Sequence, residues 1–598
     1  MWSETRCAGE LPYWPPRRRA GCSDFREAMS VMRRFAILVC TVTLFVAAQA
    51  PDSGTARDAV SIGVDLARPV GAFKPIYAWF GYDESNYTTM PRGEELLSEL
   101  HDLSPVPVTI RAHHLLTSGN GVPELKWSSS NVFHLDARGK PVYNFTITDQ
   151  TFDEFQKAGV RPMVELGFMP KDLAAEVPGI TEYQLHYPKP TMGGASNNPP
   201  KDYKMWGELV RAYTAHLVER YGRRQVSTWY FEVWNEPDIG YWHGTPEEYF
   251  KLYDYAAAGV RAALPGAMVG GPASTGPSSA KAQAFLEKFL EHCLHDKSAA
   301  DGKEVPLDFI SFHPKGRPAM VEGRDGSYVR MGIANELQAA QAGFRIVAKH
   351  PQLARLPIIL SEADPEGCAA CSMKENPANA YRNGPLYASY TAAAMKSLIE
   401  LAGESKVNLI AMLSWAFEFE GKDYFEGFRT LATNGIDKPI LNFFRMAGMM
   451  AGERVASTSS GRVALDGLVS AGARATPDVD ALATKAEHEA AVMVWNYDDD
   501  EMPAPDSDVR VEVSGIPAQT KRVLLEHYRI DQTHSNAYTV WKTMGSPQSP
   551  TPDQYVRLKA AGQLELLTSP EWLDVDDGKV EIALTLPRQA VSLLKLTW

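Results

Sequence analysis

Two glutamates in this chain stand where carboxyl groups can do chemistry. Glu236 lies in EVWNEPDIGYW (residues 232–242), directly after a Trp-Asn pair and among further aromatic residues. Glu362 ends the largely aliphatic stretch LPIILSE (residues 356–362). A carboxyl group among aromatic side chains, or beside a second carboxylate, has a raised pKa and can act as an acid. The pair therefore predicts one carboxyl group that donates a proton and a second that stays ionised.

Eight short apolar segments alternate with helical segments between residue 76 and about residue 450. Most are near-continuous apolar runs, which is typical of strands buried on both faces. Glu236 stands at the end of the fourth segment and Glu362 at the end of the seventh. The predicted strands cover residues 76–80, 108–116, 162–168, 228–235, 267–273, 307–313, 356–362 and 408–417.

The helix predicted after the fourth strand has clear signals at both ends. Thr245 is its expected N-cap, Pro246 its first residue, and Glu248 completes a capping box. The pattern ends at Pro265-Gly266. Eight strand–helix units over this length predict an α/β fold, a (β/α)8 TIM barrel, whose active site lies at the carboxyl ends of the strands.

The pattern changes after about residue 455, where strands follow one another with turns between them. These segments (490–500, 509–516, 521–530, 579–586 and 591–598) predict an accessory β-sandwich. The segment VSIGVDL (60–66) precedes the barrel and is expected to add a strand to that sandwich. The predicted domains are an N-terminal extension with a signal peptide (1–50), an N-terminal strand region (51–72), the barrel (73–452) and the sandwich (453–598).

Glu236 and Glu362 are expected to face the same cleft, because the carboxyl ends of all eight barrel strands meet at one mouth. Paired carboxyl groups in such a position are typical of glycoside hydrolysis. One protonates the leaving oxygen, and the other meets the oxocarbenium-like carbon. Asn235 is placed to hydrogen-bond a sugar hydroxyl beside the bond that breaks.

Four stretches carry a resemblance to a known family: FEVWNEPD, LDFISFHPKG, ILSEADPEG and HYRIDQTHSNAYTVWKTMGSP. The chain resembles glycoside hydrolase family 39, which holds β-xylosidases and α-L-iduronidases, from about residue 60 to its C-terminus. The resemblance implies a retaining double displacement on a barrel with a β-sandwich. It implies that Glu236 is the acid/base and Glu362 the nucleophile.

Other candidate substrate-binding residues follow from the same resemblance. His113 and His313 match histidines of the family's active site, although a lone histidine is more often structural. Trp242 is a candidate to stack on a sugar face or, equally, to pack a loop. Glu420 and Arg429 follow the eighth strand and are candidates to hydrogen-bond the substrate.

Lys315 helps to distinguish between the two activities of the family that the chain resembles. In the iduronidase branch this lysine faces the carboxylate of the substrate, and Arg429 would be a second cation for that group. The segments 527–541 and 427–439 instead resemble bacterial xylosidase-type members. We favour removal of β-D-xylosyl units from xylo-oligosaccharides. The alternatives are an exo-glycosidase for a uronic acid or related sugar and, in another class, an inactive carbohydrate-binding barrel.

The composition limits the choice of partners. The 598 residues include 60 basic and 73 acidic ones, a net charge of −13, which argues against a nucleic-acid or anionic-membrane partner. The expected partner is an oligosaccharide substrate. No His/Asp cluster with metal-ligand spacing is evident, so we expect neither a metal nor a cofactor.

The N-terminus has the pattern of a secretory signal. Two arginines precede an apolar run within residues 32–50, which ends in the small-residue motif Ala48-Gln49-Ala50. Translation from Met29 or Met32 would make residues 1–28 an upstream extension. The protein is therefore expected to be secreted or periplasmic. No later run is long enough for a membrane helix, so we expect no membrane contact after cleavage.

Three cysteines remain after the predicted cleavage: Cys293, Cys368 and Cys371. Cys368 and Cys371 are separated by two alanines, so they are able to close a local bridge in an oxidising compartment. Free thiols are the alternative.

Overall fold

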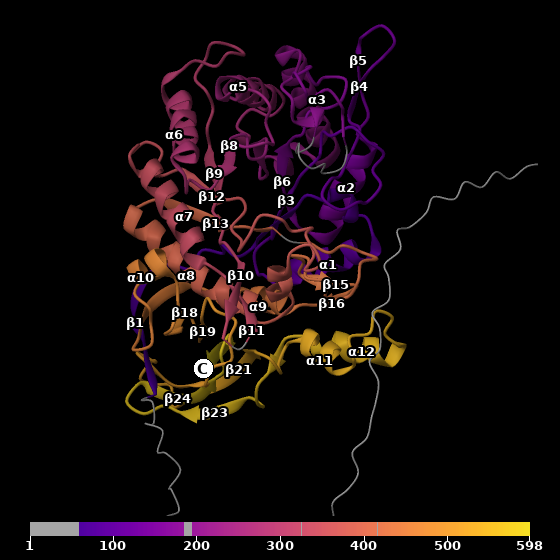
Figure 1. Ribbon diagram of the computed structural model, residues 1–598. Helices are drawn as coiled ribbons and strands as arrows, with labels where there is room; N and C mark the ends of the chain where they lie inside the picture. The colour runs from indigo at the N-terminus through magenta and orange to yellow at the C-terminus, as the bar shows by residue number, and fades with distance from the viewer. Residues whose placement is uncertain (1–58, 185–193, 325, 416) are drawn as a thin grey trace, which may run out of the picture. The chain divides into compact units, whose positions relative to one another are not determined.

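The computed structural model describes residues 59–184, 194–324, 326–415 and 417–598 (Figure 1). These residues belong to one unit, Asp58–Trp598. The predicted signal peptide and upstream extension lie outside the described residues. Within the described ranges, no helix is long and apolar enough to cross a membrane.

A parallel sheet of nine strands forms a nearly closed barrel, consistent with a TIM barrel. Its closure comes from pairing of the last strand with the first, Ser414 with Phe80 and Trp415 with Gly81. In barrel order its strands are β2 (Trp79–Tyr82), β3 (Thr109–Ala112), β6 (Arg161–Leu166), β7 (Tyr230–Val233), β8 (Met268–Thr275), β9 (Phe309–His313), β12 (Pro357–Leu360), β13 (Asn408–Met412) and β14 (Ser414–Trp415).

All eight predicted barrel strands are present, although most are shorter than their apolar segments. The eighth is divided at Leu413, whose backbone N–H donates to the carbonyl of Leu360 on β12. This division explains why the sheet has nine strands where the sequence predicts eight.

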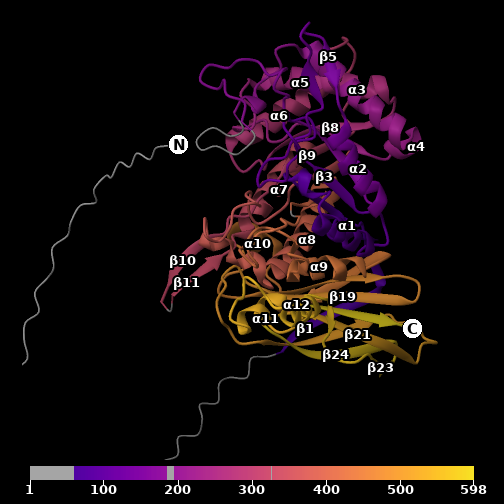
Figure 2. The same cartoon turned by 90° about the vertical axis from the view of Figure 1, so that its right-hand side faces the viewer.

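Helices follow the strands in turn, as the alternating pattern predicts (Figures 1 and 2). In chain order they are α1 (Pro91–Asp102), α2 (Thr146–Ala158), α3 (Tyr203–Tyr221), α4 (Arg223–Val226), α5 (Pro246–Ala263), α6 (Ala280–His295), α7 (Ile333–Ala348), α8 (Leu386–Ser405) and α9 (Pro439–Gly448). The capping box at the start of α5 is confirmed, since the Thr245 hydroxyl accepts from the N–H of Glu248 and the Glu248 carboxylate accepts from the N–H of Thr245.

Short hairpins and short helices interrupt the alternation of strands and helices. They are the hairpins β4 (Phe133–Leu135) with β5 (Pro141–Tyr143), β10 (Ala319–Gly323) with β11 (Gly326–Arg330), and β15 (Ala432–Thr433) with β16 (Ile436–Asp437), and the short helices η1 (Ser85–Tyr87), η2 (Ala195–Asn197) and η3 (Pro377–Asn383).

Side chains of the barrel strands alternate between the interior and the surrounding helices. Met163 of β6 and Tyr230 of β7 belong to the apolar cluster inside the barrel, together with Trp415. Two residues further along the same strands, Glu165 and Glu232 therefore also point inward. The interior thus changes from apolar to charged toward the carboxyl ends of the strands.

The C-terminal part forms a second, mostly β domain with ten strands in one sheet. They are β1 (Val60–Ala72), β17 (Glu453–Ser459), β18 (Asp478–Lys485), β19 (Glu489–Tyr497), β20 (Ser507–Ser514), β21 (Arg522–Ile530), β22 (Glu565–Leu566), β23 (Glu571–Asp574), β24 (Lys579–Leu586) and β25 (Val591–Thr597). The helices α10 (Leu465–Ala471), α11 (Ala537–Thr543) and α12 (Pro552–Ala561) lie between these strands in the sequence.

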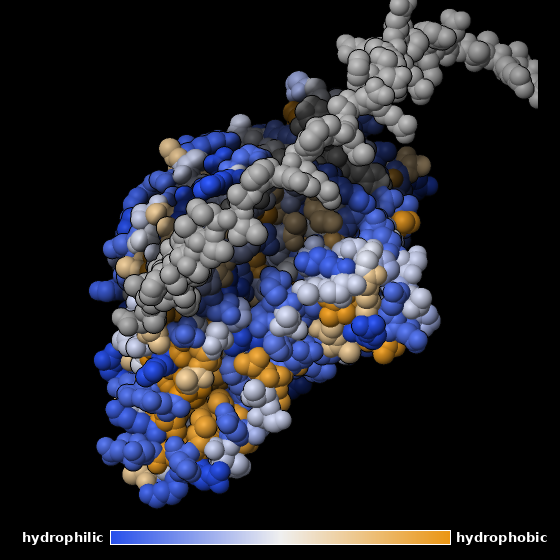
Figure 3. Space-filling view, turned by 60° about the horizontal axis from the view of Figure 1, so that its bottom comes forward, coloured by the Kyte–Doolittle hydropathy of each residue, from blue (hydrophilic) through white to orange (hydrophobic). Residues whose placement is uncertain are grey.

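The first of the described strands lies in this second sheet. β1 pairs antiparallel with β17 and parallel with β20, and its Ile62, Val64 and Leu66 are buried in the core of the sheet. Viewed from below, the surface is largely hydrophilic, with apolar patches between polar residues (Figure 3). The finer assignment to a β-sandwich, and the exact domain boundaries, stay predictions.

Candidate active site

Glu236 lies three residues after the end of β7, on backbone of unusual geometry. Trp234 has a φ of 72° and Glu236 a φ of 44°, the left-handed region that residues with a side chain rarely adopt. Such strained backbone gathers at functional sites, where the surrounding structure holds it. Here the N–H of Glu236 donates to the carbonyl of Ala273, 2.8 Å away, which ties the turn to β8.

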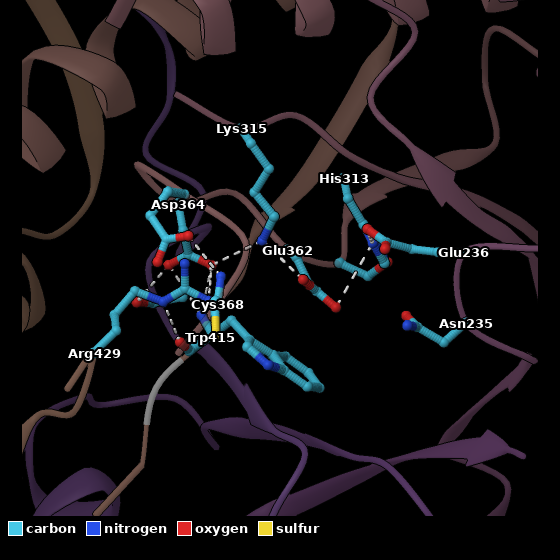
Figure 4. Close-up of polar contacts among 12 residues, drawn as sticks. Asn235, Glu236, His313, Lys315, Glu362, Asp364, Cys368, Trp415 and Arg429 are labelled. Carbon is cyan, nitrogen blue, oxygen red and sulfur yellow. Dashed lines mark hydrogen bonds and ion pairs between the residues drawn. The ribbon is translucent and has the colours of Figure 1, made fainter. Parts of the chain in front are cut away.

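Glu362 follows β12 and faces Glu236 across the barrel mouth (Figure 4). One oxygen of Glu236, one oxygen of Glu362 and a ring nitrogen of His313 all lie within 4.8 Å of one another. Both glutamates are largely buried, with side chains 14% and 6% exposed. The structure therefore brings together the two carboxyl groups that the sequence predicts to share a cleft.

His313, the last residue of β9, connects the two glutamates. Its Nδ1 is 2.9 Å from Glu236 Oε1 and 3.6 Å from Glu362 Oε1, and its Nε2 is 3.0 Å from the Ser361 hydroxyl. Burial lowers the pKa of His313 to about 3, so that the ring is neutral at pH 7. A neutral ring between two carboxyl groups orients them without supplying a permanent charge.

Glu236 holds its proton at neutral pH. Burial, and then the negative charge of Glu362, raise the pKa of Glu236 to about 8. A carboxyl group that is protonated near pH 7 is suited to general acid catalysis.

Glu362 has the opposite electrostatic setting. Burial would raise its pKa, yet the neighbouring cations hold the pKa of Glu362 well below its usual range. Since His313 is neutral, the cations responsible are Lys315, whose Nζ donates to Glu362 Oε2 at 2.8 Å, and Arg111, which donates to Oε1 at 3.2 Å. Glu362 is therefore ionised and available as a nucleophile.

Arg111 on β3 organises the charged layer beneath the two glutamates. The fully buried guanidinium group donates to Glu232 at 2.5 Å and to Asn235 at 3.0 Å, and it lies 3.4 Å from Glu165. Arg111 thus connects the Asn235 amide to the carboxylate of Glu362. The Asn235 amide oxygen accepts from Arg111, which leaves its NH2 group as the donor for a substrate.

Sequence reasoning missed Arg111, Glu165 and Glu232. A signal was present, because each is a charged residue within an apolar strand. Glu165 and Glu232 are also direct neighbours in the register of β6 and β7. In strands that are apolar on both faces, however, the sequence does not show which residues point into the barrel.

His113 lies in the same charged layer. Its Nδ1 is 2.6 Å from Asp83, and its Nε2 contacts Glu165. Burial would lower the pKa of His113, but Glu165 and Asp83 raise it to about 9. Both ring nitrogens face carboxylates of the protein, so His113 supports the site from within instead of presenting a free nitrogen to a sugar.

Trp242 and Glu420 are engaged within the protein. The Trp242 ring, 5% exposed, packs edge-on against Trp234, and its N–H donates to the carbonyl of Thr245 at 2.9 Å. This favours the loop-packing alternative for Trp242. Glu420 accepts a hydrogen bond of 3.3 Å from the backbone N–H of Arg92 in the first turn of α1.

Lys315 and Arg429 lie on opposite sides of Asp364 (Figure 4). Lys315 Nζ donates to Glu362 and, at 3.3 Å, to Asp364. Arg429 is fully buried, lies 3.5 Å from Asp364 and donates to the carbonyl of Trp415. The two cations are thus separated by a carboxylate of the protein itself.

A disulfide joins Cys368 and Cys371 in the loop that follows Glu362. Between them, the carbonyl of Ala369 accepts from the backbone N–H of Arg429 at 2.9 Å. Arg382 donates to the carbonyls of both cysteines. The bridged loop therefore helps to hold Arg429 behind the site. Cys293 is a free thiol.

Two groups of described side chains place three possible metal-ligand atoms within 4.8 Å of one another. They are Asp83, His113 and His114, and Glu236, His313 and Glu362. In the second group the same atoms hydrogen-bond one another or bind Lys315 and Arg111. These contacts give both carboxyl groups partners within the protein.

The family model of Glycosyl hydrolases family 39 matches residues 124–570, more than half of the chain. The chain belongs to glycosyl hydrolase family 39. It is therefore a glycoside hydrolase, and an inactive carbohydrate-binding barrel is no longer the alternative.

The relatives of this chain carry two activities in their names. The chain is 26% identical over 498 residues to a β-xylosidase of Geobacillus stearothermophilus, covering 81% of this chain and 86% of the relative. It is 23% identical over 545 residues to the α-L-iduronidase of Mus musculus, covering 87% and 78%. A solved monomeric β-xylosidase of Caulobacter crescentus CB15 shares the fold, with a TM-score of 0.69 at 22% identity over 90% of this chain and 99% of that one.

Proposed function

We propose that this family 39 member is a retaining exo-glycosidase that removes β-D-xylosyl units from xylo-oligosaccharides. The observation that carries the mechanism is the approach of the two carboxyl groups, with an oxygen of Glu236 within 4.8 Å of an oxygen of Glu362. Retaining enzymes keep their carboxyl groups roughly 5–5.5 Å apart, whereas inverting enzymes need roughly 6.5–9.5 Å to admit a water molecule.

The two protonation states fit the two steps of a double displacement. Ionised Glu362 attacks the anomeric carbon while Glu236 transfers its proton to the departing oxygen, which leaves a covalent glycosyl–enzyme. Glu236, now ionised, then takes a proton from water, and that water releases the sugar from Glu362. His313 and Arg111 keep both carboxyl groups in position throughout.

The contacts of Lys315 support a xylosyl unit, which has no carboxylate. Lys315 already neutralises Glu362 and Asp364, and Arg429 is buried behind Asp364. A sugar carboxylate would have to share Lys315 with the nucleophile. The alignment with the β-xylosidase of Geobacillus stearothermophilus also covers 86% of that protein.

A uronic acid in the first subsite is the second candidate. The Lys315 side chain is 18% exposed beside the nucleophile. Its hydrogen bonds to Glu362 and Asp364 leave one of its three N–H groups without an acceptor in the described part of the chain. That N–H group is available for a sugar carboxylate.

Hydrolysis of a chromogenic β-D-xyloside and a fluorogenic α-L-iduronide, measured side by side, tests the proposal. We expect turnover of the xyloside alone, with the Glu362→Ala protein as blank. Turnover of the iduronide alone would make Lys315 a carboxylate-binding residue and contradict the xylosyl assignment. Turnover of neither would reject both candidates.

We further propose that the protein acts after export, in the periplasm or the medium. The support is the signal-like sequence before residue 51 and the Cys368–Cys371 bridge, since disulfides persist in oxidising compartments. Fractionation of cells that produce the full chain tests this, and activity confined to the cytoplasm would contradict it.

A further inference from the structure

A cavity of about 280 Å³ opens beside Glu236, between the ends of β8 and β9 and the start of α7. Its lining contains Glu236 and His313 but not Glu362. The acid protonates the leaving oxygen, whereas the nucleophile attacks the sugar that stays bound. A cavity that is lined by the acid and not by the nucleophile therefore lies on the side of the leaving group. Its volume suits a single sugar unit.

The charges in this cavity are mostly positive. Its charged lining residues are Glu236, Lys315 and Arg317. Glu236 is protonated near neutral pH, and Lys315 is paired with Glu362 and Asp364. Within the described part of the chain, the guanidinium group of Arg317 makes no hydrogen bond or ion pair. An unpaired cation is thus the main charge that a leaving group would meet.

Arg317 stands on a firmly held backbone. Its N–H donates to the carbonyl of Met331, and the N–H of the preceding Gly316 donates to the carbonyl of Asp364 at 3.0 Å. A β-carbon at Gly316 would come within 2.7 Å of the Pro365 carbonyl oxygen, so the loop fits closely against the segment after Glu362. The base of the Arg317 side chain is therefore positioned relative to the catalytic pair.

Polar groups surround this cation on the cavity wall. Asn335 in the first turn of α7 and Ser278 before α6 both line the cavity. The nearby Asp238 is 6% exposed, and its carboxylate accepts from the N–H and the hydroxyl of Thr275. A planar guanidinium group with amide and hydroxyl neighbours is suited to bidentate binding of a carboxylate.

We infer that this cavity is the leaving-group subsite and that Arg317 makes it selective for a leaving sugar that carries a carboxylate. This inference rests on the proposed exo-xylosidase function. It makes the preferred substrate an acidic xylo-oligosaccharide in which the unit after the terminal xylose is a uronic acid.

Two disaccharides with the same linkage test the inference: xylosyl-glucuronic acid and xylosyl-glucose, which differ only in the carboxylate. We expect kcat/KM of the wild-type protein to favour the acidic disaccharide about tenfold, because charge-assisted hydrogen bonds to a carboxylate are stronger than those to a hydroxyl group. In Arg317→Gln the ratio should fall close to one, mainly through KM for the acidic disaccharide. Arg317→Lys should keep part of the preference.

Arg324→Gln is the matched control, because it removes the same charge from an exposed position outside the cavity lining. It should leave the ratio between the disaccharides unchanged. Higher ionic strength should reduce the wild-type preference, as for any solvent-accessible ion pair.

Two results overturn the inference alone: equal kcat/KM for both disaccharides in the wild type, or a preference that survives Arg317→Gln. If the wild type cleaves neither these disaccharides nor an aryl β-xyloside, the proposed function fails and the inference fails with it.

Discussion

Glu236 and Glu362 have identical side chains, but their surroundings give them opposite protonation states. Burial, and then the negative charge of Glu362, raise the pKa of Glu236 to about 8. Glu362 has Lys315 and Arg111 within hydrogen-bonding distance, so its pKa falls. The roles of acid and nucleophile that we propose for them depend on where the cations lie.

The pH dependence of activity should report both groups. In the proposed mechanism Glu236 acts in its protonated form, so kcat/KM on an aryl β-xyloside should fall as the pH rises through about 8. The same mechanism needs Glu362 in its ionised form, so activity should be lost on the acid side only well below the usual pKa of a glutamate.

Removal of Lys315 should shift this profile. Lys315 lowers the pKa of both glutamates, so in Lys315→Gln both limbs of kcat/KM against pH should move to higher pH. Lys303→Gln is the control, since Lys303 lies in the loop before β9, at the opposite end of that strand from His313, and is 80% exposed. An acid limb that does not move in Lys315→Gln would contradict the role given to this cation.

Part of the site could be predicted from the sequence. Glu236, Glu362, Asn235 and His313 follow recognisable strand ends, and they meet in one site. Arg111 was missed because its role depends on facing the barrel interior, which a strand with two apolar faces does not reveal.

At the scale of elements, the loop from β7 to α5 connects the acid to a capped helix. In this loop the indole N–H of Trp234 donates to the backbone carbonyl of Tyr241. The indole N–H of Trp242 donates to the backbone carbonyl of Thr245. Strand and helix positions were predictable here from periodicity and capping signals. The packing of Trp242 was not, because an aromatic residue after a strand end is equally suited to a sugar or to a loop core.

Trp242→Phe should lower the free energy of unfolding by about 1–3 kcal/mol, because it removes a buried hydrogen bond and part of a packed ring. KM for an aryl β-xyloside should be unchanged. Chemical denaturation and steady-state kinetics measure the two quantities. A severalfold rise in KM without a loss of stability would instead indicate that Trp242 stacks on the sugar.

At the scale of the whole molecule, the first and the last described strands, β1 and β25, lie in one sheet. β1 lies between β17 and β20, so residues before the barrel complete a domain whose other strands follow it. The sequence predicts that residues 60–66 add a strand to the second domain. Its pairing partners lie about 380 residues or more away in the sequence, and local sequence patterns do not show such long-range pairing.

Ile62→Ala tests this arrangement. Ile62 is 1% exposed in the core of the second sheet, so the substitution should cost about 2–5 kcal/mol of stability. The neighbouring Ser61 points to solvent, and Ser61→Ala should have little effect. Equal thermal unfolding midpoints for both variants would contradict the placement of β1 in this core.

The measurement that tests the central claim most directly is the capture of the covalent intermediate. A β-D-xyloside that carries fluorine at carbon two and an activated leaving group should form a slowly hydrolysed xylosyl–enzyme. Peptide mass spectrometry should then place the sugar on Glu362, and Glu362→Ala should remain unlabelled. A label on Glu236 or on another residue, or normal turnover without any covalent adduct, would contradict the assignment of Glu362 as nucleophile.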